Sequence, residues 1–377
     1  MSDVANTRPR VVLTVPSLAR EFGGPIDKAR RLAGALRQLG HEVTLVGPGR
    51  DANGRAVALG QRGRFRSTPV PRHLGPLRAA ISESEVVHVL GYRDPVGTLA
   101  TFAARRRRVP YVLEPCGMHR RRIRSHALKA GFDATAGRLV ISGASRIVAT
   151  SRVEHDELVA DGIVRERIVV RANGVDVDTT LDAAAGRALR ERFGIPRDVP
   201  LVISIGRLTA KKGLTSLVRA VAGLPTPWLL IAGPDAGDGT IARLRALRDD
   251  LRATDRIVIV IDGLWGDDKT AALAAADVFC LPSVSENFGT AAAEAAVVGV
   301  PVVVSDQCGV GEWLDPSATR TVPHADVEAL RTAVGEMISD PGVPAAARGA
   351  ASAVRERLDW RSLAAQQADI YRELKAR

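Results

Sequence analysis

The sequence has few aromatic residues, few cysteines and no long hydrophobic run. Phe, Trp and Tyr make up 4% of its 377 residues. Cys116, Cys280 and Cys308 are far apart and odd in number, which argues against a disulfide framework and against a zinc site. No apolar run approaches the roughly 20 residues that a membrane-spanning helix needs. The polar start, MSDVANTRPR, and the short apolar stretch after it do not fit a secretory signal. These absences predict a soluble, cytoplasmic protein.

Two common nucleotide-binding fingerprints are also missing. The chain contains neither GxxxxGK[ST] nor GxGxxG, which argues against a P-loop protein and a dinucleotide-dependent oxidoreductase. The composition, 46% hydrophobic and 25% charged, is that of a folded globular chain. Its length is too great for one ordinary core, so two or three domains are expected.

Positive charge is concentrated in the first half. Residues 1–180 carry 30 Lys and Arg against 17 Asp and Glu, a net +13, whereas the remainder carries 23 against 25, a net −2. The densest basic runs are Arg105–Arg108 and the stretch from Arg120 to Lys129. They indicate either an anionic partner or a solvated surface of an Arg-rich chain. Nucleic acid is excluded as a partner because the basic runs lack interleaved aromatics and no nucleic-acid-binding module is recognisable.

Short β-branched runs alternate with helical stretches along the chain, which predicts parallel sheets covered by helices on both faces. The pattern runs in two series, with a break near residues 174–184, and indicates two doubly wound α/β domains facing across a cleft. The first helix is expected at Asp27–Leu39, ended by Gly40. The expected strands are Arg10–Val15, Glu42–Val46, Val86–Leu90, Tyr111–Glu114, Arg146–Thr150, Ile168–Arg171, Leu201–Ile205, Trp228–Ala232, Ile257–Ile261, Val278–Leu281 and Pro301–Ser305.

A glycine-containing loop follows the first strand of each of the two series. Gly23 and Gly24 precede the first helix, where backbone amides could approach an anion, although these glycines taken alone favour an ordinary flexible loop. The second loop, Gly206–Gly213, also carries Arg207 and Lys212, and the guanidinium fork and mobile ammonium suit a diphosphate.

The segment from Pro282 to Glu294 is the strongest candidate site. A helix is expected to begin near Gly289, so Glu286 lies in the preceding loop and Glu294 about two turns into the helix. The amides of residues 287–290, namely Asn287, Phe288, Gly289 and Thr290, face the positive end of the helix dipole. Glu294 stands in an Ala- and Val-rich helix, where a carboxylate needs a partner.

These residues resemble retaining glycosyltransferases of family 4, which have the GT-B fold of two Rossmann-like domains. Glu286 and Glu294 match the Glu-x7-Glu pattern of that family. The resemblance covers nearly the whole chain, with its motifs in order: GGP at 23–25, GHEV at 40–43, NGVD at 173–176, GRLTAKKG at 206–213, AGPD at 232–235, SENFG at 285–289 and EAAVVGVPVVVSD at 294–306. It implies an acceptor-side domain at 1–178, joined by a closing helix at about 360–377, and a donor domain at 179–359.

The resemblance also implies roles for individual residues. Arg207 and Lys212 would neutralise the donor diphosphate, and Gly24 would approach the same phosphates from the first domain. Glu286 would hold the hydroxyls of the transferred sugar, near the amides of residues 287–290. Glu294 would bind the ribose. Leu264 and Trp265 belong to a loop that would lie near the base. Neither a metal nor another cofactor is expected for the chemistry, since cations and a helix dipole stabilise the leaving diphosphate.

One departure from the family concerns the acceptor and sugar side, where Gly23, Cys116 and His119 are the candidate residues. Many relatives have His immediately before Gly117, where this chain has Cys116, although His119 is close. If Cys116 occupies that place, a His contact to the donor sugar is missing.

The sequence therefore predicts a metal-independent, retaining hexosyltransferase that uses a nucleotide sugar, in polysaccharide or glycoconjugate assembly. Its expected acceptor is a sugar, a lipid-linked saccharide or another hydroxyl compound. The basic first half favours peripheral contact with an anionic membrane surface on the cytoplasmic side. The alternatives are a catalytically weak nucleotide-sugar or glycan-binding protein, and a natural-product glycosyltransferase. A nucleotide-sugar epimerase is disfavoured by the Glu-x7-Glu pattern and by the GRLTAKKG segment.

Overall fold

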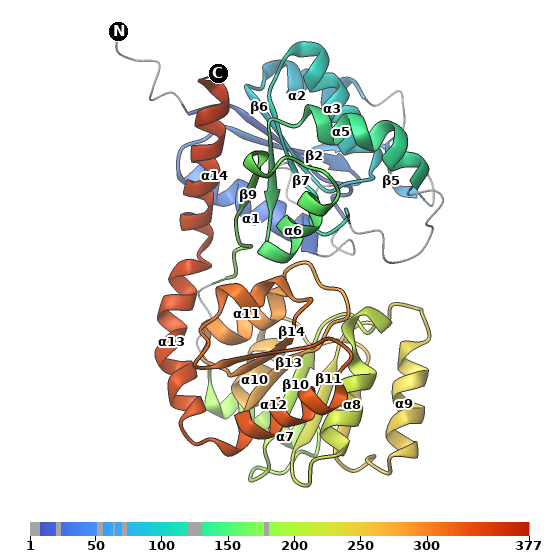
Figure 1. Ribbon diagram of the computed structural model, residues 1–377, viewed down its shortest axis with the longest axis vertical. Helices are drawn as coiled ribbons and strands as arrows, with labels where there is room; N and C mark the ends of the chain where they lie inside the picture. The colour runs from blue at the N-terminus through green and yellow to red at the C-terminus, as the bar shows by residue number, and fades with distance from the viewer. Residues whose placement is uncertain are drawn as a thin grey trace. The chain divides into compact units, whose positions relative to one another are not determined.

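Two parallel β-sheets organise the chain, and each belongs to its own α/β unit (Figure 1). The computed structural model describes residues 8–19, 24–50, 56–62, 65–69, 74–119, 130–176 and 181–376. Unit 1 comprises Met1–Gly174 and Trp360–Arg377, and unit 2 comprises Val175–Asp359. The last helix of the chain therefore belongs to the first unit.

The sheet of unit 1 has seven parallel strands in the order β3-β2-β1-β6-β7-β8-β9. Its central strands are rich in Val, Ile and Leu because helices cover both faces and each side chain enters a core. A separate antiparallel pair, β4 with β5, completes the unit. The strands are β1 (Val11–Thr14), β2 (Val43–Pro48), β3 (Ala56–Leu59), β4 (Gln61–Arg62), β5 (Phe65–Pro69), β6 (Val86–Leu90), β7 (Tyr111–Glu114), β8 (Arg146–Ala149) and β9 (Ile168–Val170).

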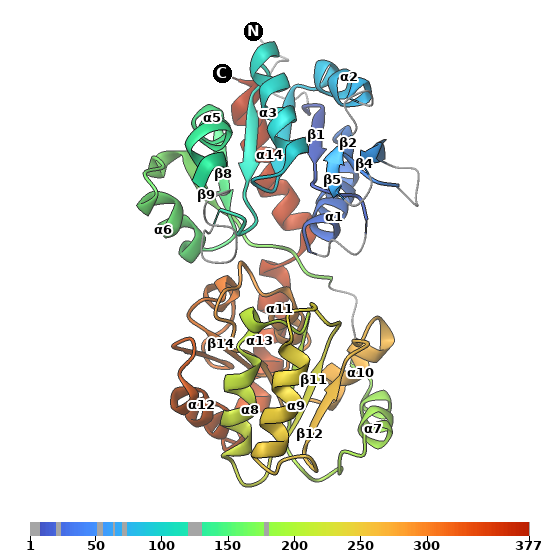
Figure 2. The same ribbon diagram turned by 90° about the vertical axis from the view of Figure 1, so that its right-hand side faces the viewer.

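Alternate side chains of this sheet enter two different cores. Leu13 of β1 packs with α1 and α14 on one face, and Val12 packs with α2, α3 and α5 on the other. Figure 2 shows α3 in front of the sheet and α14 behind it. The helices are α1 (Gly24–Gln38), α2 (Gly75–Glu83), α3 (Pro95–Arg107), the π-helical η4 (Asp133–Gly137), α5 (Arg138–Gly143), α6 (Arg152–Ala160), the 3₁₀ turn η5 (Arg165–Arg167) and α14 (Trp360–Lys375).

The sheet of unit 2 has six parallel strands in the order β12-β11-β10-β13-β14-β15. The chain order reverses between β10 and β13, which lie side by side although two strands separate them in sequence. Ligands of open α/β sheets bind beyond the carboxyl ends of strands at such a point. The strands are β10 (Leu201–Ile205), β11 (Trp228–Ala232), β12 (Ile257–Val260), β13 (Val278–Leu281), β14 (Val302–Ser305) and β15 (Thr319–Val322).

Helices cover both faces of this second sheet as well. Residues of α8, α9 and α12 form one core with Val202 and Leu229, whereas α10 and α11 pack against β10, β13 and β14 outside that core. The helices are α7 (Ala183–Arg192), the 3₁₀ turn η6 (Ala210–Lys212), α8 (Leu214–Ala222), α9 (Thr240–Asp250), α10 (Asp267–Ala275), α11 (Thr290–Val297), the 3₁₀ turn η7 (Gly309–Trp313), α12 (Val327–Ser339) and α13 (Val343–Arg357).

The structure confirms the doubly wound fold class, and each strand expected from the sequence is present. The short strands β3, β4, β5 and β15 were not expected. β3 and β15 are edge strands, each paired with one neighbouring strand. In β15, Thr alternates with Arg and Val. β15 carries a weak hydrophobic pattern because part of it remains accessible to water, whereas the four residues of β3, Ala-Val-Ala-Leu, are too few to distinguish a strand from a helix.

Candidate functional site

The loops after β10 and β13 touch at the carboxyl edge of the second sheet. The amide of Val284 donates to the carbonyl of Lys211 at 2.8 Å. Gly213 makes this approach possible, because it has φ +64° and a Cβ added there would lie 2.0 Å from the carbonyl oxygen of Pro282. The two segments that the sequence pattern selected therefore form one continuous surface.

Three charged residues that the sequence selected lie on these two loops. Lys212 Nζ is 2.5 Å from Glu286 Oε2, and both side chains are one-fifth exposed. Arg207 is exposed, and no ion pair or hydrogen bond of its side chain occurs within the described ranges. The structure thus pairs the proposed sugar-binding carboxylate with one proposed phosphate-binding cation and leaves the other cation accessible.

Asp238, which the sequence analysis missed, braces the loop that carries Arg207 and Lys212. Its carboxylate accepts hydrogen bonds from Thr209 Oγ1 at 2.7 Å, from the Ala210 amide at 3.0 Å and from the Thr240 amide at 3.1 Å. The bonds from Thr240, Ala210 and Thr209 hold the pKa of Asp238 below its usual value. Asp-Gly-Thr just before a helix, a sequence that favours an Asx turn, is the signal that could have identified this contact.

The segment before α11 has the expected geometry. Gly289, at φ +99°, precedes the first helical residue, Thr290, which is exposed. Phe288 is buried, so its side chain supports the core and only its backbone faces the loop. Asn287 is half-buried between Glu286 and this core.

Glu294 forms the ion pair expected of a carboxylate in an Ala- and Val-rich helix. Lys269 Nζ of α10 lies 2.7 Å from Glu294 Oε1, and both side chains are partly exposed. Sequence reasoning did not select Lys269 either, because Lys269 lies 25 residues before Glu294 and on a different helix.

The two candidate base-loop residues differ sharply in exposure. The side chain of Leu264 is 2% exposed, and that of Trp265 is 68% exposed. The indole of Trp265 donates from Nε1 to the carbonyl of Asp262 at 3.1 Å, which orients the ring. Of the two, Trp265 is the one that presents a surface to a ligand.

Gly24 is the first residue of α1, which follows β1 in unit 1. It is exposed, and no atom lies within 4 Å of a Cβ added there. Gly23 lies outside the described residues. Nothing within the described part of the unit therefore requires glycine at position 24.

Cys116 lies in a tight turn after β7. It has φ +52°, is partly buried against the core under α1, and burial raises the pKa of its thiol to about 12. The next amide, that of Gly117, donates to Glu154 Oε1 at 2.7 Å. Glu154 is itself buried and also accepts from the amide and hydroxyl of Thr150. A carboxylate from α6 thus holds the turn in place.

His119 is 7% exposed and packs beside Tyr92. Its Nε2 lies 2.7 Å from Asp161 Oδ2. The guanidinium of Arg93 bonds to the carbonyl of His119 and pairs with Asp133. These contacts tie the His119 ring into the structure of unit 1. The basic residues Arg120–Arg124 and Lys129 lie outside the described residues.

A buried charge cluster at the end of β7 is the largest feature that sequence reasoning missed. Glu114 is fully buried and pairs with Lys28 of α1 and, at 2.9 Å, with Arg171. His88 Nε2 lies 3.2 Å from the same carboxylate, and its Nδ1 is 2.6 Å from Tyr371 OH of α14. Burial alone would raise the pKa of Glu114, but the charges of Lys28 and Arg171 outweigh it and hold the pKa well below its usual range.

One signal of this cluster was present in the sequence. Lys28 lies four residues before Leu32, on the apolar face of α1, where a solvated lysine is not expected. His88 and Cys280 are both fully buried.

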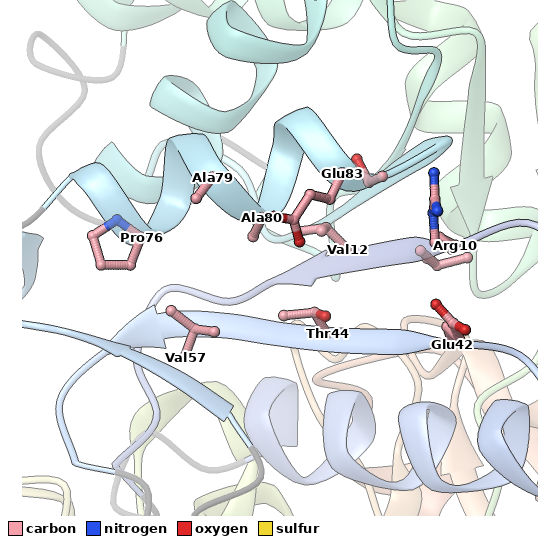
Figure 3. Close-up of a pocket in the computed structure, with 11 residues that line it drawn as sticks. Arg10, Val12, Glu42, Thr44, Val57, Pro76, Ala79, Ala80 and Glu83 are labelled. Atoms are coloured by element: carbon pink, nitrogen blue, oxygen red, sulfur yellow. The ribbon is translucent and has the colours of Figure 1, made fainter.

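A cavity of about 370 Å³ lies in unit 1, at the amino ends of its strands (Figure 3). It opens between α2 and the beginnings of β1 and β2, where the small side chains of Ala79 and Ala80 face the strands. Because parallel strands present loops and helix N-termini at their carboxyl ends, this cavity is not the expected ligand site.

The described ranges contain neither a metal-binding cluster nor a membrane-spanning helix. No group of three His, Cys, Asp or Glu side chains there is arranged to hold a metal ion. None of the described helices is both long and apolar enough to cross a bilayer.

Comparisons with known proteins agree with this geometry. Residues 187–354 match the model of "Glycosyl transferases group 1", and residues 23–174 match "Glycosyl transferase 4-like domain". A D-inositol 3-phosphate glycosyltransferase of Xylanimonas cellulosilytica is 34% identical over 316 residues, 79% of this chain and 75% of that protein. A GDP-mannose-dependent alpha-(1-6)-phosphatidylinositol monomannoside mannosyltransferase of Mycolicibacterium smegmatis is 33% identical over 212 residues, 52% of this chain and 54% of that protein.

A solved structure shows the same fold. HepE from Anabaena, in complex with UDP and glucose, superposes with a TM-score of 0.80 at 18% identity, covering 96% of this chain and 99% of that one. The two Rossmann-like sheets are those of the GT-B fold. The family models, the relatives and the paired loops of the second sheet together show that this chain is a glycosyltransferase and belongs to the glycosyl transferases group 1 family.

Proposed function

We propose that this glycosyltransferase moves a hexose from a nucleoside diphosphate sugar to an acceptor hydroxyl with retention of anomeric configuration. The observation that carries the proposal is the Lys212–Glu286 ion pair beside the exposed Arg207 at the carboxyl edge of the second sheet. Two cations and a carboxylate at one point suit a substrate that joins a diphosphate to a sugar with several hydroxyls.

The chemistry follows from the charge that develops when the sugar leaves the diphosphate. Arg207 and Lys212 stabilise the departing phosphate oxygens, and the amides at the start of α11 add the positive end of a helix dipole. Lys212 then exchanges its contact with Glu286 for the diphosphate, which frees Glu286 to bind sugar hydroxyls. These groups supply the neutralisation that a metal provides elsewhere, so the reaction is proposed to need neither a metal nor another cofactor.

The remaining donor contacts are assigned by position. Glu294 binds the ribose, and the exposed indole of Trp265 offers a face for the base. The backbone amides of Asn287 and Thr290 approach the phosphates and sugar. Gly24 contributes its amide from unit 1.

We propose an acceptor that carries a phosphate group, in glycoconjugate or polysaccharide assembly. Two relatives are named for acceptors that contain inositol phosphate or phosphatidylinositol. The net +13 of residues 1–180 favours such an anion electrostatically. Cys116 and His119 lie in the unit proposed to bind the acceptor.

Peripheral association with an anionic membrane on the cytoplasmic side is proposed for the same unit. The last turn of α3 carries Arg105, Arg106 and Arg107, and the same helix exposes Leu99 and Phe102. Cationic and apolar side chains on one helix suit the boundary between lipid headgroups and acyl chains.

The test is a donor screen combined with two substitutions. Purified protein is incubated with UDP-, GDP-, ADP- and dTDP-sugars, and donor hydrolysis and thermal stabilisation are measured. Arg207→Ala and Lys212→Ala each remove a charge-assisted contact worth roughly 1.5–3 kcal/mol, so turnover of the accepted donor should fall about tenfold to hundredfold.

Arg245→Ala, on the exposed face of α9, is the matched control and should leave turnover unchanged. Wild-type rates in both site variants would contradict the diphosphate assignment. Proton NMR of the product tests retention, because an inverted anomeric configuration would overturn it.

A further inference from the structure

Lys269 and Glu294 form a contact between the two helices that follow β12 and β13. Lys269 is the third residue of α10, and Glu294 lies in the second turn of α11. Lys269 Nζ lies 2.7 Å from Glu294 Oε1, and the side chains are 32% and 23% exposed. No other ion pair of either side chain occurs in the part of the chain that the structure describes.

The ion pair with Lys269 involves only one of the two oxygens of the Glu294 carboxylate. Lys269 bonds to Oε1, and within the described residues Oε2 makes no hydrogen bond. A carboxylate that accepts from vicinal hydroxyls needs a fixed plane and an oxygen that is not already occupied. The contact with the Lys269 ammonium fixes the plane of the Glu294 carboxylate and leaves Oε2 able to accept from a hydroxyl.

Charge gives the contact a second effect. The nucleoside diphosphate is anionic, and a carboxylate placed near it would repel it. The Lys269 ammonium next to Glu294 offsets that negative charge, so Glu294 can face the nucleotide without weakening its binding.

We propose that Lys269 is a positioning residue for the donor: it orients the Glu294 carboxylate toward the ribose and neutralises it against the diphosphate. The inference rests on the proposed ribose role of Glu294. It adds a residue on α10, outside the Glu-x7-Glu segment, to the groups that determine nucleotide affinity.

The experiment measures the dissociation constants of UDP and GDP, and of their 2′,3′-dideoxy analogues, by titration calorimetry. The variants are Lys269→Gln, Lys269→Arg, Glu294→Gln and the double variant of Gln at both positions. Arg192→Gln is the matched control, because Arg192 pairs with Asp268 of the same helix at 3.0 Å on the exposed surface. Thermal unfolding of each variant shows that the fold is retained.

Lys269→Gln should weaken binding of the preferred nucleotide about tenfold, the loss of one charge-assisted contact. Lys269→Arg should recover most of this loss, and Arg192→Gln should match the wild type. The double variant should bind no more weakly than Glu294→Gln. Lys269→Gln should weaken binding of the dideoxy analogue less than that of the parent nucleotide, because only the effect on the diphosphate remains when the ribose hydroxyls are absent. At saturating donor, kcat of Lys269→Gln should stay within about threefold of wild type, because the ribose does not react.

The outcomes separate the two hypotheses. If Glu294→Gln binds the nucleotide normally, the ribose assignment fails and the role of Lys269 fails with it. If Glu294→Gln weakens binding but Lys269→Gln does not, the proposed function stands and the positioning role is wrong. If the losses of the two single variants add in the double variant, Lys269 acts independently of Glu294, which also overturns the inference.

Discussion

Asp94 illustrates how a single buried carboxylate couples the stability of this protein to pH. It is 6% exposed and caps α3, where its side chain accepts from the Gly97 amide at 2.7 Å. Burial raises its pKa to about 6, from an ordinary value of 3.8. Because the folded state then holds the proton more tightly than the unfolded chain, the stabilising contribution of Asp94 is full below pH 3.8 and is lost as pH rises through about 6.

Asp94→Asn should remove this dependence. Asn retains the capping oxygen, so the cap survives while the buried charge does not form. Between pH 4 and 7 the wild type should lose up to about 3 kcal/mol of stability that the variant keeps, the equivalent of the pKa shift. Urea unfolding of both proteins at several pH values measures the difference, which should grow with pH. Parallel profiles would contradict the prediction.

At the scale of elements, α14 docks on unit 1 through buried polar contacts as well as apolar ones. Its Leu363, Ala364 and Leu374 are buried, and α14 lies beside α1 (Figure 1). Gln367 Oε1 accepts from Arg171 Nε at 3.0 Å, and the hydroxyl of Tyr371 meets His88. Buried polar groups of this kind specify one position of a helix, because any shift leaves them without partners.

Tyr371→Phe should loosen α14 while the rest of the protein keeps its structure. The substitution leaves a buried ring nitrogen of His88 without its hydrogen bond, which costs about 1–3 kcal/mol. Hydrogen exchange followed by mass spectrometry should show α14 amides exchanging roughly fivefold to hundredfold faster. Arg372→Gln, on the exposed side of the helix, is the control and should exchange like the wild type. Unchanged protection in Tyr371→Phe would show that apolar packing alone holds the helix.

At the scale of the whole molecule, the uneven charge distribution is the dominant feature. The net +13 of residues 1–180 contrasts with −2 in the remainder, and the described part of the basic excess includes the end of α3. A surface of this kind attracts anionic lipid over about one Debye length, roughly 8 Å at physiological ionic strength.

The protein should therefore sediment with vesicles that contain phosphatidylglycerol and be released by salt, but not with vesicles of phosphatidylcholine alone. Reversing Arg106 and Arg107 to Glu should weaken binding by at least about tenfold, since each basic residue contributes about 1 kcal/mol. Arg245→Glu, in unit 2, changes the net charge by the same amount per site and should have little effect. Equal losses per substituted site in the two variants would show that net charge, and not the α3 surface, governs the association.

The fold class and the segments that form the candidate site are predictable from the amino-acid sequence alone. Each of the predicted strands is mainly a run of β-branched and aliphatic residues, and each of the loops at 206–213 and 282–289 carries its glycines and charges within a few positions. Such local patterns are legible because backbone conformation and burial on both faces of a parallel sheet depend on neighbouring residues. The edge strand β15 was not predicted because it carries less of that pattern, and β3 was not predicted because four apolar residues do not distinguish a strand from a helix.

Which charged groups meet depends on how the chain packs in three dimensions. Lys212 and Glu286 are 74 residues apart, Lys269 and Glu294 are 25 apart, and Glu114 pairs with Arg171 across 57 residues. These contacts depend on strand order: β10 lies beside β13, and the closing helix returns to the first sheet. A sequence reports which residues are charged, but long-range pairing follows from how the strands and helices pack, and that packing also made Lys28 a buried cation and left Trp265 exposed.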